Sequence, residues 1–477
     1  MDRRTFLAWT ARGSALGLGL RPALARAASG ALRLDGLRHR QAAPGFEGET
    51  CASLALEFLG HAISPADIFT SSGVSAALGR GCSPAELDTA LTAIGVDTGV
   101  VWRPLRPDED PVTVARAGLH ELVGELRRGR PVIVYLGAGA GDSPGAPGYA
   151  LIAGVEGNSV LLHDPARQDG AWSRMPKSTL YERWPASGDD DARGLVTLRA
   201  RPVGVERPEP EPGARALAYA QHVRELRARI NRELAGRFLV VVEPPFIAIT
   251  DGDADTVRRY VSGTIRWAVH HLRKDYFRSD PTELLDVWLF RDHESYVGNT
   301  RRLFDEEPET PYGYYDPAHA ALIMNIATGG GTLVHELVHP YMAANFAACP
   351  SWFNEGLASL YEQSSEEGGR IVGLTNWRLE GLQWAIRRGR VPSFQTLCST
   401  GKRPFYNRDP GTNYAQARYL CYYLQERQLL RRYYHAFVRA QLHDPTGYET
   451  LRAVLGVSDM DEFKAEWERF VLGLSFP

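Results

Sequence analysis

Two histidines and two glutamates between residues 335 and 355 have the types and the spacing of a metal site. His335, Glu336 and His339 form the pattern His-Glu-x-x-His, and Glu355 follows after fifteen further residues. On a helix, His335 and His339 lie one above the other on the same face, with Glu336 rotated by about 100° from His335. Two imidazoles so placed can bind zinc, and the neighbouring glutamate can reach a water on the metal. The alternative is two amphipathic helices with well-placed polar residues.

The surroundings of the motif favour the metal site. Residues 319–326 have a strand pattern, and the glycines of 327–331 lead from them into the helix, as expected of a substrate-binding edge strand before an active-site helix. Glu355 lies in a second helical segment, 352–361, far enough along the chain for a helix–turn–helix return. Gly356 and Ala358 are small, so we expect this segment to approach the first helix closely.

Pro340 directly follows the second histidine. It has no amide to donate to the Glu336 carbonyl, and it disfavours the helical conformation at His339. The residues after Pro340 are compatible with a helix, which favours a kink over a helix end. We therefore expect His339 still to face His335.

These residues carry a family resemblance. The run His335-Glu336-Leu337-Val338-His339, followed by Asn-Glu-Gly-Leu-Ala at 354–358, resembles the gluzincin peptidases and, more narrowly, the peptidase MA-like domains of bacterial envelope proteins. Residues 312–326 and 413–424 also fit that pattern, and the resemblance covers about 240–430. It implies a zincin-like fold with His335, His339 and Glu355 as zinc ligands.

The same resemblance implies a mechanism. Glu336 would be the general base that activates a zinc-bound water, and a tyrosine from a later helix would stabilise the oxyanion. Tyr414 is our candidate for that tyrosine. The alternatives are four other tyrosines: Tyr312, Tyr314, Tyr315 and Tyr406.

A second set of residues lies in the first half of the chain. Cys51 is near the start of a predicted helix, whose dipole would lower the pKa of the thiol. Residues 38–190 resemble the C39-like papain-fold domains, in which a cysteine, a histidine and an aspartate form the active site. Cys51 and Asp164 match, but Tyr149 stands at the histidine position and is a poor base. His163 should point away from Asp164. We expect an inactive domain that binds peptide or only packs.

The element order predicts an α+β protein with two domains. The first, 30–200, has helices followed by an antiparallel sheet, with Ser83 and Glu86 forming a capping-box pattern and 137–148 a glycine-rich loop. Prolines and glutamates at 201–215 predict a linker. The second domain, 216–477, begins with a helix, continues with a mixed sheet that includes a strand at 238–250, and ends in a helical half.

The first 27 residues have the features of an export signal. Arg3-Arg4 precedes a mildly apolar run that ends in Ala25-Arg26-Ala27, and this resembles the twin-arginine type. No later apolar run is long enough to span a bilayer. We therefore expect a mature protein without a membrane span that is exported to the periplasm or the exterior. There, five cysteines allow one or two disulfides, Cys349 with Cys398 among the pairings.

The sequence thus predicts an exported zinc metallopeptidase that acts on peptide or protein substrates. A net charge of −3 gives no reason to expect nucleic acid or an anionic membrane as a partner. One alternative is a non-catalytic envelope protein that binds peptides and whose two sites are vestigial. The other is a cysteine peptidase that uses Cys51. Substrate identity and oligomeric state are not determined by these patterns.

Overall fold

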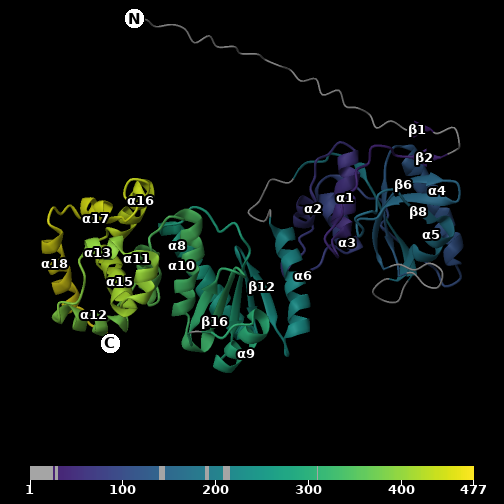
Figure 1. Cartoon of the computed structure of the whole chain (residues 1–477). Coiled ribbons are helices and arrows are strands. Elements are labelled where there is room, and N and C mark those ends of the chain that lie inside the picture. The colour runs from purple at the N-terminus through teal and green to yellow at the C-terminus, as the bar shows by residue number, and fades with distance from the viewer. Residues whose placement is uncertain are drawn as a thin grey trace, which may run out of the picture. The chain divides into compact units, whose positions relative to one another are not determined.

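The computed structural model describes residues 25–26, 31–138, 146–187, 193–207, 215–308 and 310–476. These residues form two compact units, divided between Glu225 and Leu226 (Figure 1). Both units combine helices with β-sheets, so the predicted α+β class is confirmed. Within the described ranges, no helix combines the length and the apolar character needed to cross a lipid bilayer.

Two predicted features fall largely outside the described ranges. Of the predicted signal, 1–27, only Ala25–Arg26 is described, as a short strand paired with Leu32–Arg33. Most of the glycine-rich loop at 137–148 is likewise not described.

Unit 1 is built on one antiparallel sheet with the strand order β1-β2-β6-β5-β10-β4, to which β7, β8 and β9 are added. Its strands are β1 (Ala25–Arg26), β2 (Leu32–Arg33), β4 (Trp102–Pro104), β5 (Val132–Leu136), β6 (Gly148–Glu156), β7 (Ser159–His163), β8 (Ser173–Pro176), β9 (Pro185–Ser187) and β10 (Arg193–Arg199). Its helices are α1 (Glu47–Phe58), α2 (Pro65–Ser71), α3 (Pro84–Ala93), α4 (Pro111–Arg127) and α5 (Lys177–Arg183). Before α3, Ser83 and Glu86 form the predicted capping box.

Alternation along β6 divides the core of unit 1 into two layers. Tyr149 and Leu151 belong to the cluster that contains Cys51 of α1, whereas Ala150 and Ile152 belong to a second cluster with residues of α4 and α5. Because successive strand residues point to opposite faces, the two clusters cover opposite faces of the sheet.

The predicted linker, 201–215, does not coincide with the division between the units. Its first residues form strand β11 (Arg201–Pro202), which pairs with β3 (Val96–Asp97), and Arg201 contacts the buried carboxylate of Glu125 at 2.6 Å. Helix α6 (Ala216–Glu233) contributes Ala220 to the core of unit 1 before the chain enters unit 2. Proline and glutamate content predicted a break in packing, but strand pairing and an ion pair tie the start of the segment to unit 1.

Unit 2 begins with a five-stranded mixed sheet of order β12-β13-β14-β16-β15. The strands are β12 (Leu239–Glu243), β13 (Phe246–Thr250), β14 (Leu285–Phe290), β15 (Gly313–Asp316) and β16 (Ala321–Asn325). Residues 238–250 form a hairpin rather than the single strand predicted, because two prolines at 244 and 245 interrupt the run. The edge strand is β15, which pairs antiparallel with β16, so the prediction that residues 319–326 form the edge is wrong.

Helices make up the remainder of unit 2, together with a small hairpin. They are α7 (Ala254–Thr256), the π-helix η2 (Val257–Arg266), α8 (Trp267–Asp275), α9 (His293–Phe304), α10 (Gly331–Asn345), α11 (Ser351–Leu360), α12 (Arg378–Arg387), α13 (Phe394–Ser399), α14 (Lys402–Asn407), α15 (Pro410–Glu426), α16 (Leu430–Ala440), α17 (Tyr448–Leu455) and α18 (Met460–Leu472). The hairpin is β17 (Ser364–Glu367) with β18 (Arg370–Gly373).

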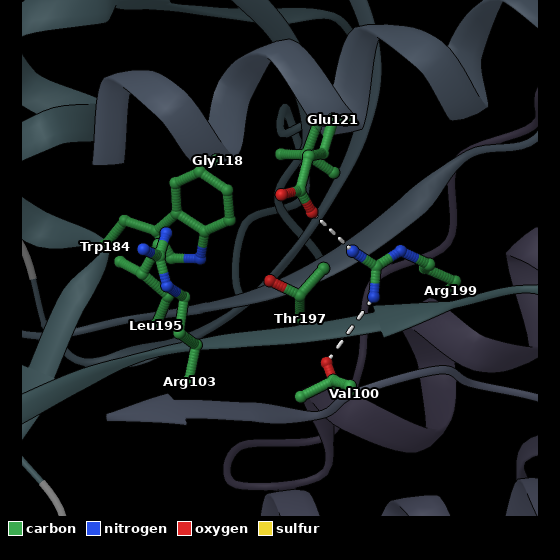
Figure 2. Close-up of a pocket in the computed structure, with 9 residues that line it drawn as sticks. Val100, Arg103, Gly118, Glu121, Trp184, Leu195, Thr197 and Arg199 are labelled. Atoms are coloured by element: carbon green, nitrogen blue, oxygen red, sulfur yellow. Dashed lines mark hydrogen bonds and ion pairs between the residues drawn. The ribbon is translucent and has the colours of Figure 1, made fainter. Parts of the chain in front are cut away.

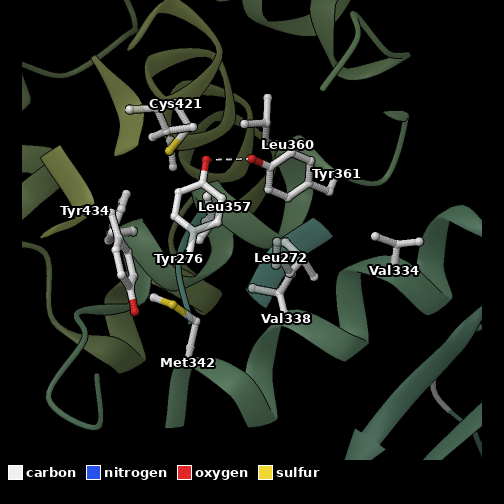
Figure 3. Packing of buried hydrophobic residues seen from close by; sticks show 14 of the residues in the cluster. Leu272, Tyr276, Val334, Val338, Met342, Leu357, Leu360, Tyr361, Cys421 and Tyr434 are labelled. Atoms are coloured by element: carbon white, nitrogen blue, oxygen red, sulfur yellow. Dashed lines mark hydrogen bonds between the residues drawn. The ribbon is translucent and has the colours of Figure 1, made fainter. Parts of the chain in front are cut away.

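The apolar side of α10 anchors it in the core of unit 2. Val334, Val338 and Met342, at helical spacing, are buried with Leu272 of α8 and with Tyr276, the C-cap residue of that helix (Figure 3). This packing fixes the rotation of α10 about its axis, and therefore the direction in which its histidines point.

Gly356 permits a close approach of α11 to α15. A Cβ atom at this position would lie 2.9 Å from the Ala417 carbonyl oxygen and 3.1 Å from the Cys421 sulfur. We predicted that the small side of this helix faces α10, but the tight contact is with α15.

We therefore expect Gly356→Ala to destabilise unit 2 by about 1–3 kcal/mol, because backbone and sulfur atoms must move to admit the methyl group. The matched control is Gly381→Ala in α12, where a Cβ meets no atom within 4 Å. That change should raise the free energy of unfolding by up to about 1 kcal/mol. Urea unfolding measures both, and equal effects of the two substitutions would contradict this account of Gly356.

Candidate functional site

Helix α10 places the two histidines side by side. It runs without a break from Gly331 to Asn345 through Pro340, so the helix does not end at His339. The imidazole rings of His335 and His339 have centroids 4.9 Å apart, with their planes at 76°. As expected, the second histidine still faces the first. The apolar contacts on the opposite side of α10 hold this geometry despite the amide that Pro340 lacks.

Helix α11 brings Glu355 against both imidazoles. Its Oε2 lies 3.3 Å from His335 Nε2 and 3.9 Å from His339 Nε2, and the side chain is almost fully buried. Tyr406, on α14, donates a hydrogen bond of 2.6 Å to the other carboxylate oxygen, Oε1. Oε2 accepts no hydrogen bond from any described residue. Glu355 Oε2 thus lies close to a potential ligand nitrogen of each histidine.

Glu336 lies in the same cluster but in a different environment. His335, Glu336 and His339 each offer a ligand atom within 4.8 Å of the others. Burial raises the pKa of Glu336 above its ordinary value, with the two histidines opposing the shift. Burial would also raise the pKa of Glu355, but contacts with His335 and His339 lower it to about 2. Because Glu355 approaches both Nε2 atoms and stays ionised, it is the better third ligand, whereas Glu336 is better suited to holding a proton.

The outer nitrogens of both imidazoles face polar partners. His335 Nδ1 lies 3.1 Å from Glu362 Oε1, a close ionic contact rather than an aligned hydrogen bond. His339 Nδ1 donates to Asn354 Oδ1 at 3.1 Å. Partners at Nδ1 orient the rings and leave Nε2 available for a metal.

Glu362 is itself fixed by two further side chains. Arg378 donates to both carboxylate oxygens, at 2.8 and 3.2 Å, and Asn376 donates to Oε2 at 3.2 Å. Sequence reasoning missed Glu362 and Arg378. Glu362 lies beyond the end of α11, which is capped by Tyr361, so helical periodicity offered no signal for it. Nothing in the local sequence pointed to Arg378.

The electrostatic field at His335 favours positive charge. Burial lowers the pKa of this imidazole, but the carboxylates of Glu355 and Glu362 more than reverse the effect and raise it well above its ordinary value. A site that stabilises an extra proton between buried carboxylates also stabilises a divalent cation there.

Two of the five candidate tyrosines lie at the site. Tyr406 contacts Glu355 directly, and the Tyr414 ring is 6.1 Å from the Tyr406 ring. Burial, followed by the negative charge of Glu355, raises the pKa of Tyr414. The guanidinium of Arg378, which also binds the Glu362 carboxylate beside His335, lies 5.3 Å from the Tyr414 ring centroid.

The other three tyrosines lie elsewhere, and a further one, Tyr296, is within electrostatic range of Glu336. Tyr312 is more than half exposed, and Tyr314 donates to Glu306 at 3.0 Å. Tyr315 is half-buried; its pKa is raised by burial and by Glu283. By contrast, burial raises the pKa of Tyr296 to about 12, and the charge of Glu336 adds to the shift.

In unit 1 the structure places Cys51, Tyr149 and Asp164 within electrostatic range of one another. Burial first, then Asp164, raises the pKa of Cys51 well above its ordinary value, contrary to our prediction. The residue is the fifth of α1, beyond the first turn where the helix dipole acts, and its side chain is fully buried. Tyr149 donates to the Cys82 carbonyl at 3.0 Å. A buried neutral thiol beside this tyrosine has no base to activate it.

His163 does not supply that base. Its ring packs 4.8 Å from Trp172 and 5.6 Å from His39, and burial lowers its pKa to about 4. All five cysteines lie in the described ranges and are free thiols, so the pairing of Cys349 with Cys398 that the sequence allowed is not formed.

Figure 2 shows a pocket of unit 1 between α4 and the strands β4 and β10. Its lining is partly apolar and partly charged: Val100, Arg103, Gly118, Glu121, Leu122, Trp184, Leu195, Thr197 and Arg199. Leu122, Trp184 and Leu195 belong to the core layer on the sheet face opposite Cys51. This pocket therefore does not lead a ligand to the thiol.

No protein-family model matches this chain, and no curated protein matches it. We therefore infer the function from the geometry of the site itself.

Glu362 provides a test of that geometry. Glu362→Gln removes the charge beside His335 Nδ1 and should weaken zinc binding by about 10- to 100-fold. The control is Glu367→Gln, an exposed carboxylate of the neighbouring hairpin. Competition titration with a zinc chelator measures both affinities. An unchanged zinc affinity in Glu362→Gln would show that the carboxylate does not support the ligand.

Proposed function

We propose that this chain is an exported zinc-dependent metallopeptidase of the gluzincin type. The observation that carries the proposal is the buried Glu355 Oε2, which lies against the Nε2 atoms of His335 and His339 and accepts no hydrogen bond from the described residues. A buried carboxylate oxygen normally has a donor, and two neutral imidazole nitrogens with one carboxylate are a common zinc ligand set. The residues present therefore fit the metal.

His335, His339 and Glu355 would hold the ion, and it would supply Lewis acidity for a peptide carbonyl. Glu336 is one residue from His335 on α10 and is partly buried in the same cluster. Its raised pKa suits a group that takes a proton from an attacking water and returns it to the leaving amine. Tyr414 would donate a hydrogen bond to the developing oxyanion, and its ring lies beside that of Tyr406.

The sheet edge supports a peptide as the substrate. Strand β15 is the last strand of its sheet and packs beside α10. An open strand edge can pair with the backbone of an extended peptide, which would lay a scissile bond along the site. Nothing comparable supports catalysis by Cys51, because the thiol is buried and lacks a base.

The central test compares the purified protein with Glu336→Gln. We expect about one zinc per chain in both, and a loss of peptide hydrolysis by about 10²- to 10⁴-fold in the variant, because the proton acceptor is gone. Removing the metal with a chelator should abolish hydrolysis, and adding zinc should restore it.

Cys51→Ala is the matched control and should keep full activity. Full activity in Glu336→Gln would sink the proposed mechanism. Zinc binding without hydrolysis in the unsubstituted protein would favour the non-catalytic peptide-binding alternative, and activity lost in Cys51→Ala would favour a cysteine peptidase.

The two tyrosines of the site should behave differently. Tyr414→Phe should lower kcat by about 10²- to 10³-fold with little change in KM, since a donor to the transition state is lost. Tyr406→Phe should instead weaken zinc binding, because Glu355 loses its hydrogen bond. Steady-state kinetics and zinc titration of the two variants separate these roles. The reverse pattern would assign the oxyanion role to Tyr406.

A further inference from the structure

Helix α12 has an exposed aromatic side. Trp377, at its N-cap, is 55% exposed and Trp384 is 45% exposed, although tryptophan is usually among the more buried residues. Their positions differ by seven, so they lie on the same face of the helix. The opposite face holds α12 on unit 2 through buried Leu379, Leu382 and Ile386.

Three arginines gather at the end of the same helix. Arg387 lies in the last turn, and the guanidinium groups of Arg388 and Arg390 lie 4.2 and 5.0 Å from the Trp384 ring centroid. The turn is fixed, because Gly389 has a φ of 61° and the Arg390 amide donates to the Ala385 carbonyl at 3.0 Å.

None of these three arginines forms an ion pair with a described carboxylate. All three are exposed. The acidic residue of α12, Glu380, lies in the first turn, at the other end of the helix. Interaction with the helix dipole accounts for one cation in the last turn. It does not account for three, nor for the exposed indole of Trp384 beside them, nor for the second exposed indole at the N-cap.

The combination has a distinct chemical complement. Guanidinium groups bind phosphate oxygens with two parallel hydrogen bonds, and indole rings prefer the boundary between lipid headgroups and acyl chains. We propose that the face formed by Trp377, Trp384, Arg387, Arg388 and Arg390 docks unit 2 on a bilayer surface that contains anionic phospholipid. The bilayer is touched and not spanned, and the indoles lie at headgroup depth.

The docking face also adjoins the candidate metal centre. Trp377 directly precedes Arg378, whose guanidinium holds the Glu362 carboxylate beside His335. The proposal does not depend on catalysis, because the face is defined by exposure and charge alone. If the membrane docking and the proposed peptidase activity both hold, the protein would bind its substrates close to a membrane surface.

The test is binding of the full chain to vesicles of phosphatidylcholine with and without phosphatidylglycerol, followed by co-sedimentation. We expect binding only when phosphatidylglycerol is present, weakened by added salt. Replacing Arg387, Arg388 and Arg390 together by Gln should weaken it by about fivefold for each arginine removed. The charge-matched control replaces three exposed arginines elsewhere in unit 2, namely Arg302, Arg432 and Arg439.

Brominated lipids report whether the indoles reach the bilayer. Fluorescence quenching on binding should fall when Trp377 and Trp384 are changed to Phe. Equal loss of binding in the two arginine-triple variants would overturn the proposal, as would quenching that is unaffected by the tryptophan changes. Displacement by an acidic polypeptide, with no quenching in the unsubstituted protein, would instead assign the face to an acidic protein partner.

Discussion

The helical half of unit 2 depends on one buried negative charge. The Glu355 carboxylate is only 5% exposed, and an ionised carboxylate removed from water is costly unless groups around it compensate. Compensation comes from two other helices: α10 supplies the imidazoles and α14 the Tyr406 hydroxyl, against a charge that α11 carries. If any of these helices moved, the buried carboxylate would lose a partner. The polar site and the apolar packing behind it therefore constrain each other.

The groups that compensate the charge of Glu355 are arranged in successive shells around it. Next to Glu355 are the imidazoles; beyond His335 is Glu362, and beyond that carboxylate is Arg378. Acidic and basic side chains alternate outward from the site, so Glu355, His335, Glu362 and Arg378 each face a partner of the opposite kind. Buried networks of this kind rigidify a structure only when every member is satisfied, and here Glu355 Oε2 and His335 Nδ1 have no hydrogen-bond partner among the described residues.

The spacing of residues along the sequence identified the site residues themselves better than it identified the residues around them. His335 and His339 follow from a four-residue helical repeat, and Glu355 from the length of a helix–turn–helix return. Arg378 could not be predicted, because its contact with Glu362 arises from folding and not from any local pattern. The edge strand was predicted wrongly for a related reason. Residues 319–326 have a composition that suits a strand at any position in a sheet, and only the strand pairing places β15 outside β16. The pKa of the Cys51 thiol also depends on tertiary burial, which raises it and outweighs the lowering expected near the start of a helix.

Helix α6 has a consequence for dividing this chain. Ala220 joins the core of unit 1, with Leu217 packed against it, while Arg229, further along the same helix, lies over Phe304 in unit 2. A recombinant fragment that stops at residue 215, where composition suggests a natural cut, would uncover apolar side chains of the first core. A fragment that begins at 226 would start in mid-helix, without the turns that precede it. Neither half has a clean terminus at this helix, so separating the two units requires a redesigned cap and not merely a truncation.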